Sequence, residues 1–446
     1  MTGHMQANPN IILISADSLR ADHLGCYRYP LATSPSIDAM ACQGVLCENV
    51  FAPGIPTQPS HTTIFTGQHP LTHGVVAHGG KATLARHTPV LAELLLEEGY
   101  CTCAVDTLFR ERTWFGRGFE YVIDPSAHHV FYASVTQEEL TGRAIRWLKT
   151  IPEGPFFLFI HYWDAHYPYV PPERMKGLFY DGRNPVDPAN HALDEWWNHP
   201  IGALARDTWL RTPKGPITDP AYVTALYDRG IHYLDEGIAA LQESLERIGA
   251  AENTLIMLLA DHGESLTDHR ICYDHYGLYD CTLRVPLIAR WPAGNLREGC
   301  RLIPFRQLSD VAPTLLEAAG APIPVDTDGV SFLRQLQGRE EPAGYDRVLG
   351  LESTWQAKYC LRTGRYKFIL AREPDLLGNP DRELYDLEVD PREERNLAVQ
   401  DPQVAAEMEK ELESWIAERL QAAGRTQDPV CEEGAVGVMI WQGHRT

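Results

Sequence analysis

Short apolar runs alternate along the chain with longer stretches in which apolar residues recur every three or four positions. A continuous apolar run bounded by polar residues is typical of a strand that is buried on both faces of a parallel sheet. Strands are therefore predicted at NIILISA (10–16), CTCAV (101–105), PFFLFIHY (155–162), NTLIMLLA (253–260) and RVPLIARW (284–291).

The stretches between these runs carry the spacing and the end signals of amphipathic helices. One helix is expected to begin at Thr88 as its N-cap, with Pro89 in the first helical position, and to end at Gly99. Others are predicted over 136–151 and 309–320. The longest is predicted over 222–249, closed by Gly249, with one apolar face formed by Ile231, Leu234, Ile238, Leu241, Leu245 and Ile248.

The order of these elements predicts the fold class. Strands that alternate with helices indicate an α/β fold, with a large mostly parallel sheet sandwiched by helices. After about residue 340 the pattern changes to short strands separated by turns, followed by an amphipathic helix. We expect a catalytic domain over 1–340 and a small α+β subdomain over 341–446, and we expect the Trp- and Pro-rich stretch 173–220 to pass over the site.

Composition and charge narrow the range of partners and compartments. The chain has 446 residues and a formal net charge of −21, which disfavours nucleic acid and anionic membranes as partners. Its start, MTGHMQANPN, lacks the pattern of a signal peptide, and no apolar run reaches the ~20 residues of a membrane span. The ten cysteines show no zinc spacing, and we expect them to be reduced and buried in a cytoplasmic protein.

Polar residues that bind metals follow the predicted strands. Asp17 and Asp261 each end a strand, His262 comes directly after Asp261, and His161 closes another strand. Because parallel strands place their carboxyl ends at one edge of a sheet, these side chains are candidates for one metal site. The alternative for each Asp is a turn or cap residue. A bound metal would also supply the positive centre that an anionic substrate needs in so acidic a protein.

Thr57 is harder to interpret from its neighbours alone. It lies in PTQPSHTTIFTG (56–67), and in isolation it is a turn residue between two prolines. The residues after it are compatible with a helix whose first amides face an anion. Several histidines, among them His166 and His275, cluster near predicted strand ends, which favours a functional site over scattered structural histidines.

The ordered series of motifs resembles the sulfatase family of the alkaline phosphatase superfamily from about residue 10 to about residue 400. The resemblance implies an α/β sandwich with a smaller C-terminal subdomain, as the pattern also predicts. The motifs are DSLRADHLGCYRYP (17–30), PTQPSHTTIFTGQHPLTHGV (56–75), HYWDAHYPYVPP (161–172), ADHGESLTDH (260–269), HYGLYDCTLRVPLIARWP (275–292), LSDVAPTLLEAAG (308–320), DGVSFL (328–333), RTGRYKFIL (362–370) and ELYDLEVDPREERNLA (383–398).

The resemblance also implies roles for individual residues. Asp17, Asp261 and His262 match metal ligands of the family, and Thr57 occupies the position of the nucleophile, which also touches the metal. His166 matches a histidine that binds substrate and serves the leaving group, and His275 stands where many members hold the substrate with a lysine. The expected substrate-binding residues are His61, His78 and His161.

The sequence also departs from the sulfatase pattern. Thr57 replaces the cysteine that sulfatases convert to formylglycine, Ser18 replaces the second residue of an Asp-Asp pair, and His61 replaces an arginine. The family's Gly-Lys-x-His-type stretch is also missing. Phosphonate monoester hydrolases and phosphodiesterases resemble this pattern of Asp, Asp and His ligands more closely, with one divalent Mn, Zn or Fe favoured and Ca or Mg possible.

These comparisons predict a metal-dependent hydrolase that attacks phosphodiesters or phosphonate monoesters through Thr57. An ester on Thr57 lacks the second hydroxyl through which the hydrate of formylglycine expels sulfate. Water must therefore attack the phosphorus or sulfur atom of that ester, as it attacks phosphorus in phosphorylated enzymes. The alternatives are a sulfatase that works without formylglycine, a phospho-group transferase, and a binding protein that has lost catalysis. The expected partner is a small anionic ester, and a homo-oligomer is compatible with the sequence.

Overall fold

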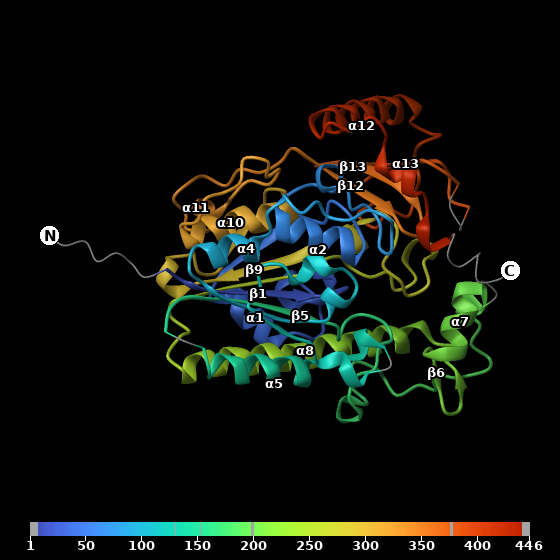
Figure 1. The fold of residues 1–446 in the computed structure, drawn as a ribbon. Coiled ribbons are helices and arrows are strands. Elements are labelled where there is room, and N and C mark those ends of the chain that lie inside the picture. The colour runs from blue at the N-terminus through green and yellow to red at the C-terminus, as the bar shows by residue number, and fades with distance from the viewer. Residues whose placement is uncertain (1–7, 130, 152, 198–199, 375–377, 439–446) are drawn as a thin grey trace.

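A mostly parallel sheet of nine strands forms the centre of the structure, a computed structural model that describes residues 8–129, 131–151, 153–197, 200–374 and 378–438 (Figure 1). Within this sheet, as far as the structure describes it, β9 alone runs antiparallel to its neighbours, β8 and β2. The α/β fold with a large mixed sheet is confirmed. The strand order is β10 (Cys300–Leu302), β2 (Val45–Phe51), β9 (Arg284–Arg290), β8 (Thr254–Leu259), β1 (Asn10–Ala16), β5 (Phe156–Tyr162), β3 (Cys101–Val105) and β4 (Tyr121–Ile123), and β11 (Arg306–Gln307) pairs with β2.

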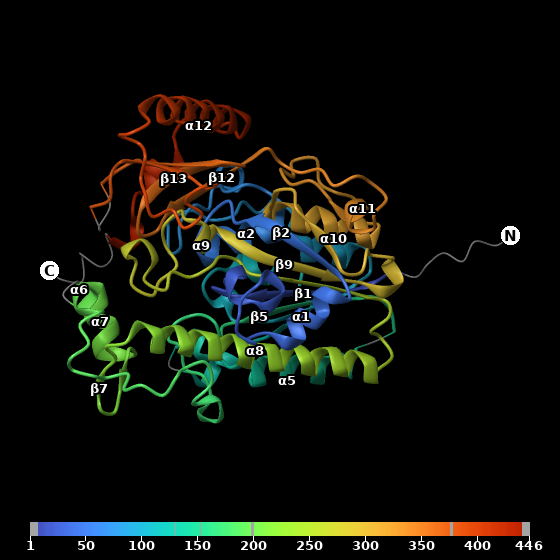
Figure 2. The same ribbon diagram turned by 180° about the vertical axis from the view of Figure 1, so that it is seen from behind.

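Helices cover both faces of this sheet, as Figures 1 and 2 show from opposite sides. The strands between them are apolar on both faces because both faces are covered, and Leu13 and Leu258 have no exposed surface. No helix in the described part of the chain is long and apolar enough to span a bilayer. One face carries α1 (Pro35–Cys42), α5 (Gln137–Leu148) and α8 (Pro220–Arg247), and the other carries α2 (Thr57–Thr66), α4 (Leu91–Glu97), α10 (Val311–Ala319) and α11 (Leu333–Leu336).

Several elements differ from the sequence-based expectation, among them helix α4, strand β2 and the short strands β4, β10 and β11; none of these strands was predicted. Helix α4 begins at Leu91, with Val90 as its N-cap, so the prediction of Thr88 as N-cap and Pro89 in the first turn is wrong. Val90 is extended, with φ −118° and ψ 150°, and this conformation keeps Pro89 outside the helix. Strand β2 was not predicted, because Glu48 and Asn49 interrupt its apolar run; Glu48 pairs with Arg28 and Arg301.

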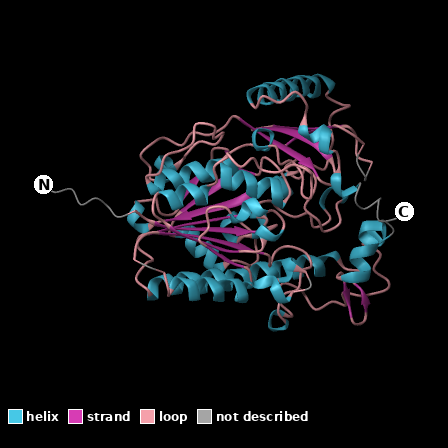
Figure 3. Ribbon diagram, viewed as in Figure 1, coloured by secondary structure: helices cyan, strands magenta, loops and turns pink. Residues whose placement is uncertain are grey.

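A second, antiparallel sheet forms the C-terminal part, beneath the long helix α12 (Pro402–Ala422) (Figure 3). Its apolar cluster also includes Leu71 and Val76, from the segment around the short helix α3 (Pro70–His73). The boundary at residue 340 stays a prediction. Its strands are β12 (Arg347–Ser353), β13 (Ala357–Thr363), β14 (Tyr366–Ala371) and β15 (Arg382–Asp386). Two short helices not yet named are α9 (Asp280–Leu283) and α13 (Pro429–Glu433).

The stretch 173–220 contains two helices, α6 (Asp194–Trp197) and α7 (Pro200–Thr208), and a hairpin of β6 (Arg211–Thr212) and β7 (Gly215–Pro216). Trp209, which follows α7, stacks on Tyr167 with ring centroids 5.8 Å apart. Tyr167 belongs to the motif that carries His166, so the stretch does reach the site. Residues 198 and 199 of its LDEWWNHP segment lie outside the described residues, as do residues 1–7 of the amino-terminal stretch.

All ten cysteines are free thiols, which agrees with the expected reduced state. The expectation that they are all buried holds for Cys47, Cys103, Cys272 and Cys360; Cys26, Cys101, Cys281 and Cys300 are only partly buried, and Cys42 and Cys431 are exposed. Cys42 is the last residue of α1, where the helix leaves the core, and Cys431 lies on the outer side of α13.

Candidate metal and nucleophile site

Two neighbouring strands bring Asp17 and Asp261 together. β1 and β8 are paired in parallel and end side by side, so the first carboxylate after each strand lies at the same edge of the sheet. Both side chains are completely buried, and the amide of Ser18 donates a hydrogen bond to Asp261 Oδ1 at 3.3 Å. His262 lies between them, with Nε2 3.6 Å from Asp17 Oδ1 and 3.2 Å from Asp261 Oδ2.

Thr57 reaches this group from the opposite direction, as the first residue of α2. Its Oγ1 lies 3.3 Å from His262 Nε2, and only 2% of the residue is exposed. The hydroxyl of Ser60 donates to the carbonyl of Asp261 at 2.7 Å and ties the first turn of α2 to the end of β8. The predicted nucleophile and the predicted metal ligands therefore form one cluster.

The cluster fits a divalent cation. Asp17 Oδ2 and Asp261 Oδ2 are buried and make no hydrogen bond, and two carboxylates with an imidazole suit a borderline metal such as Zn, Mn or Fe. His262 Nδ1 lies 2.9 Å from the carbonyl of Gly263 and donates to it, which leaves Nε2 unprotonated, the state a ligand needs. Burial and the charge of Asp17 raise the pKa of Asp261 to about 7, as expected for two buried carboxylates close together.

His166 and His275 border the cluster, as predicted from their motifs. The His275 ring stacks on His262, with centroids 4.6 Å apart, and on Tyr167 at 5.5 Å. His166 lies 5.0 Å from His275, centroid to centroid, and its Nδ1 donates to the carbonyl of Tyr167. Burial lowers the pKa of His166 and also lowers that of His275, with His262 adding to the second shift, so both rings are neutral near neutral pH.

A neutral His275 does not supply the fixed positive charge of the lysine that it replaces. Asp274 and Asp280 are the two acidic residues closest to His275 in the sequence, and Asp274 Oδ1 lies 3.6 Å from His275 Nδ1. The other, Asp280, pairs instead with Lys367 at 2.5 Å and with Arg362 at 3.4 Å, so it does not act on His275. His275 can still donate a hydrogen bond as a neutral imidazole.

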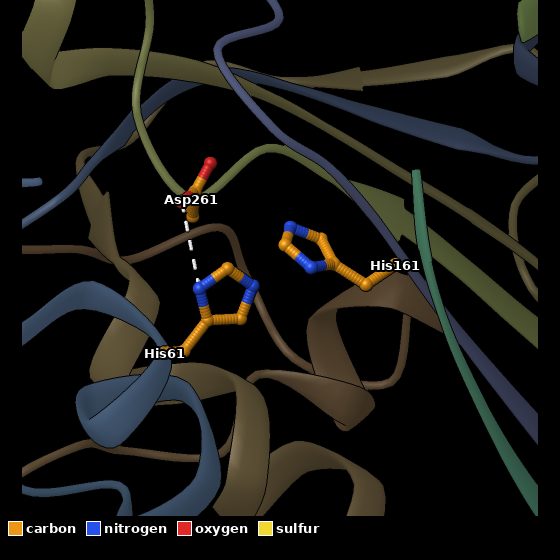
Figure 4. Close-up of side chains that lie close together, drawn as sticks. All are labelled: His61, His161 and Asp261. Atoms are coloured by element: carbon orange, nitrogen blue, oxygen red, sulfur yellow. Dashed lines mark ion pairs between the residues drawn. The ribbon is translucent and has the colours of Figure 1, made fainter. Parts of the chain in front are cut away.

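The three histidines expected to bind substrate occupy two different environments. His61 and His161 are completely buried beside Asp261, and Figure 4 shows the two rings close together below its carboxylate. His78 is about a third exposed, with Nε2 3.8 Å from Glu111 Oε2. A substrate contact by these residues stays a prediction, and the burial of His61 and His161 places them behind the carboxylates.

The chain matches the family described as Sulfatase over residues 9–321, and N-sulphoglucosamine sulphohydrolase, C-terminal, over residues 268–421. The first match covers well over half of the chain. The chain belongs to the sulfatase family. Sulfatase-family proteins are hydrolases of anionic sulfate or phosphonate esters and generally use a divalent metal, and this protein is an ester hydrolase of that family.

Named relatives of this sulfatase-family chain include the Delta 4,5-hexuronate-2-O-sulfatase of Bacteroides thetaiotaomicron, 24% identical, with 98% of this chain and 95% of the relative covered. The Ulvan-active sulfatase of Formosa agariphila is 26% identical, with 97% and 83% covered. Among solved structures, the phosphonate monoester hydrolase of Agrobacterium radiobacter is similar, with a TM-score of 0.73, 24% identity and 92% and 96% covered. This last similarity concerns the fold.

Sequence reasoning missed two acidic residues of this sulfatase-family site. Asp106 directly follows β3 and accepts a hydrogen bond from His161 Nδ1 at 3.1 Å. It is a third strand-end aspartate, like Asp17 and Asp261, and that position was the available signal. Glu264, two residues after His262, is completely buried, 3.7 Å from His275 Nδ1, and burial raises its pKa well above the usual value.

Proposed function

We propose that this protein hydrolyses phosphodiesters or phosphonate monoesters, with Thr57 as the nucleophile and a divalent cation held by Asp17, Asp261 and His262. One observation carries the proposal: the Thr57 hydroxyl meets the metal-ligand nitrogen of His262 at 3.3 Å, at the start of a ten-residue helix. The helix amides at this end favour an anion, which suits a negatively charged substrate in the same place.

The bound cation supplies positive charge at the ester and lowers the pKa of a neighbouring hydroxyl. Asp17, Asp261 and His262 would hold it; Mn, Zn or Fe fits this donor set best, and Ca or Mg is possible. Burial excludes water from the Thr57 side chain, so its oxygen competes with little solvent for the substrate.

The chemistry of Thr57 favours phosphorus over sulfur. Attack by its oxygen on a phosphorus centre expels an alcohol and leaves a phosphoryl ester on Thr57, which water then cleaves by attack on phosphorus. The hydrate of formylglycine has a second hydroxyl, which re-forms the aldehyde and expels sulfate by cleavage of the carbon–oxygen bond, and threonine has none. A sulfate ester on Thr57 would have no such exit.

His166 is suited to help the water step. Because its Nδ1 donates to the carbonyl of Tyr167, its Nε2 carries the lone pair and can accept a proton. The lowered pKa keeps this nitrogen available near neutral pH. This geometry favours a proton acceptor over the proton donor that a leaving group needs, and it modifies the role implied by the family resemblance.

Charge gives a second reason for the substrate class. The carboxylates of Asp17 and Asp261, an ionised Thr57 and one divalent cation leave about one negative charge in the site. A monoanionic diester or phosphonate monoester is repelled less there than a dianionic phosphate monoester. A sulfate monoester is also monoanionic, so this reason does not separate phosphorus from sulfur.

A sulfatase acting through Thr57 is the second candidate, and the sulfatase names of the sequence relatives favour it. The deciding experiment compares kcat/KM for a phosphodiester, a phosphonate monoester and a sulfate ester with the same chromogenic leaving group, with each metal in turn. The proposal expects the two phosphorus esters to exceed the sulfate. A higher kcat/KM for the sulfate would reverse the assignment, and products of transfer to an added alcohol would identify a transferase.

A further inference from the structure

Beside the first metal site lies a second group of donor atoms, contributed by His61, His161 and Asp261. One ligand atom from each residue lies within 4.8 Å of the others, and all three side chains are completely buried (Figure 4). We infer that these residues, with Asp17, hold a second divalent cation. The inference extends the proposed function, because Asp17 and Asp261 are shared between the two sites.

His161 has the surroundings of a metal-ligating histidine. Its Nδ1 lies 3.1 Å from Asp106 Oδ1, and its Nε2 points at Asp17 Oδ2 at 3.3 Å without forming a hydrogen bond. A carboxylate that accepts the Nδ1 proton fixes the tautomer and leaves Nε2 as the ligand, the arrangement found around metal-bound histidines. The other carboxylate oxygen of Asp106, Oδ2, accepts a hydrogen bond from the Leu108 amide at 2.9 Å, which holds Oδ1 towards His161.

His61 completes the group from the first turn of α2. Its Nε2 lies 3.0 Å from Ser15 Oγ and can donate to that hydroxyl, which leaves Nδ1 unprotonated. Nδ1 lies 3.4 Å from Asp261 Oδ2. In the other tautomer Nδ1 would donate to the carbonyl of Thr57, 3.0 Å away, and His61 would then only brace the helix. The two tautomers make opposite predictions about metal content.

The two carboxylates are placed to serve both cations. Asp17 directs Oδ1 towards His262 and Oδ2 towards His161, at 3.6 and 3.3 Å. Asp261 Oδ2 lies 3.2 Å from His262 Nε2 and 3.4 Å from His61 Nδ1. The second site thus offers two nitrogens and one carboxylate oxygen within 4.8 Å of one another, and Asp17 Oδ2 beside His161 is available as a fourth donor, a set that suits four-coordinate Zn and also Mn or Fe.

The surroundings favour a cation over a substrate contact. The rings of His61 and His161 lie 4.5 Å apart, centroid to centroid, and His61 also packs against Phe65, Phe115 and Phe159. Completely buried imidazoles packed against phenylalanine rings offer little surface to a substrate, whereas a metal ion needs only their ring nitrogens beside the carboxylates. A second divalent cation would change the charge of the site from about one negative to about one positive, which would admit dianionic phosphate monoesters.

Metal content tests the inference without any substrate. Wild-type protein saturated with Zn²⁺ and freed of excess metal by gel filtration is expected to contain two equivalents per chain by inductively coupled plasma mass spectrometry. His161→Gln is expected to contain one. His73→Gln serves as the matched control, because His73 is also buried but bonds Thr63 and the Val75 amide, and it is expected to keep two.

A second variant covers the case in which His161→Gln fails to fold. Asp106→Asn leaves His161 in place. In a competition titration with a chromophoric chelator, it is expected to raise the Kd of the second Zn²⁺ ion by about 10- to 100-fold and to leave the Kd of the first unchanged. A wild-type protein that saturates at one equivalent or fewer, or an Asp106→Asn protein that binds both equivalents normally, would overturn the inference. If the protein binds two equivalents of Zn²⁺ but hydrolyses no ester, the proposed function would be wrong and the inference of a second metal site would stand.

Discussion

Replacing Thr57 by alanine removes one oxygen from the centre of the site. That oxygen lies 3.3 Å from His262 Nε2. The two neighbouring hydroxyls are occupied elsewhere: Ser60 donates to the Asp261 carbonyl at 2.7 Å and Ser18 donates to Asp17 Oδ1 at 3.0 Å. Thr57→Ala therefore leaves water as the replacement attacker, at a position that no side chain fixes.

The expected loss follows from this geometry. When a covalent nucleophile is removed and the rest of the site stays, rates fall by about 10⁴-fold or more, which corresponds to a barrier higher by about 5 kcal/mol. Thr57→Ser keeps the oxygen and loses only the methyl group of a side chain that is 2% exposed. It should lower the free energy of unfolding by about 1 kcal/mol and the rate by less than about tenfold.

The assay compares wild-type, Thr57→Ser and Thr57→Ala on a chromogenic phosphodiester at saturating metal, with thermal denaturation as the check on folding. Mass spectrometry of the protein after rapid acid quenching should show a phosphoryl adduct on the peptide containing Thr57 in the first two proteins only. A Thr57→Ala protein that turns over within about tenfold of wild type, or an adduct on another residue, would refute the assignment of the nucleophile.

Three further predictions concern the metal, His275 and a buried ion pair. Asp261→Asn should lose bound metal and activity together, and chelation should abolish wild-type activity; full activity in metal-free protein would contradict the first site. His275→Ala should lower kcat/KM by about 10²-fold, the scale for the loss of one preorganised hydrogen-bond donor. Because burial lowers the pKa of His275, the loss should be the same at every pH above about 6.5. An unchanged kcat/KM would mean that His275 only packs against its neighbours. Burial opposes the charge on Asp280, but Lys367 and Arg362 hold its pKa below the usual value, so its stabilising contribution is present above about pH 4 and is lost as the pH falls through the folded-state pKa. Asp280→Asn should therefore lower the free energy of unfolding at neutral pH and flatten its decline in acid, measured by urea denaturation, and an unchanged acid limb would refute this role.

The elements of the fold follow largely from local sequence. β1, β3, β5, β8 and α8 were predicted close to their observed bounds, because burial on both faces of a strand, or on one face of a helix, imposes a pattern within a single segment. The strand-end positions of Asp17 and Asp261 follow from the same pattern, and the motif resemblance pointed to Thr57 and His262.

Contacts between distant segments were decided only by the tertiary structure. The sequence does not state that β8 pairs with β1 or that β9 runs antiparallel between β8 and β2, since strand order depends on which apolar faces cover one another. The neutral state of His275 depends on burial by several segments, and the engagement of Asp280 by Lys367 joins α9 to the second sheet. His61 and His161 meet beside Asp261 because the start of α2 and the ends of β5 and β8 converge on one buried point, and no local pattern encodes that convergence.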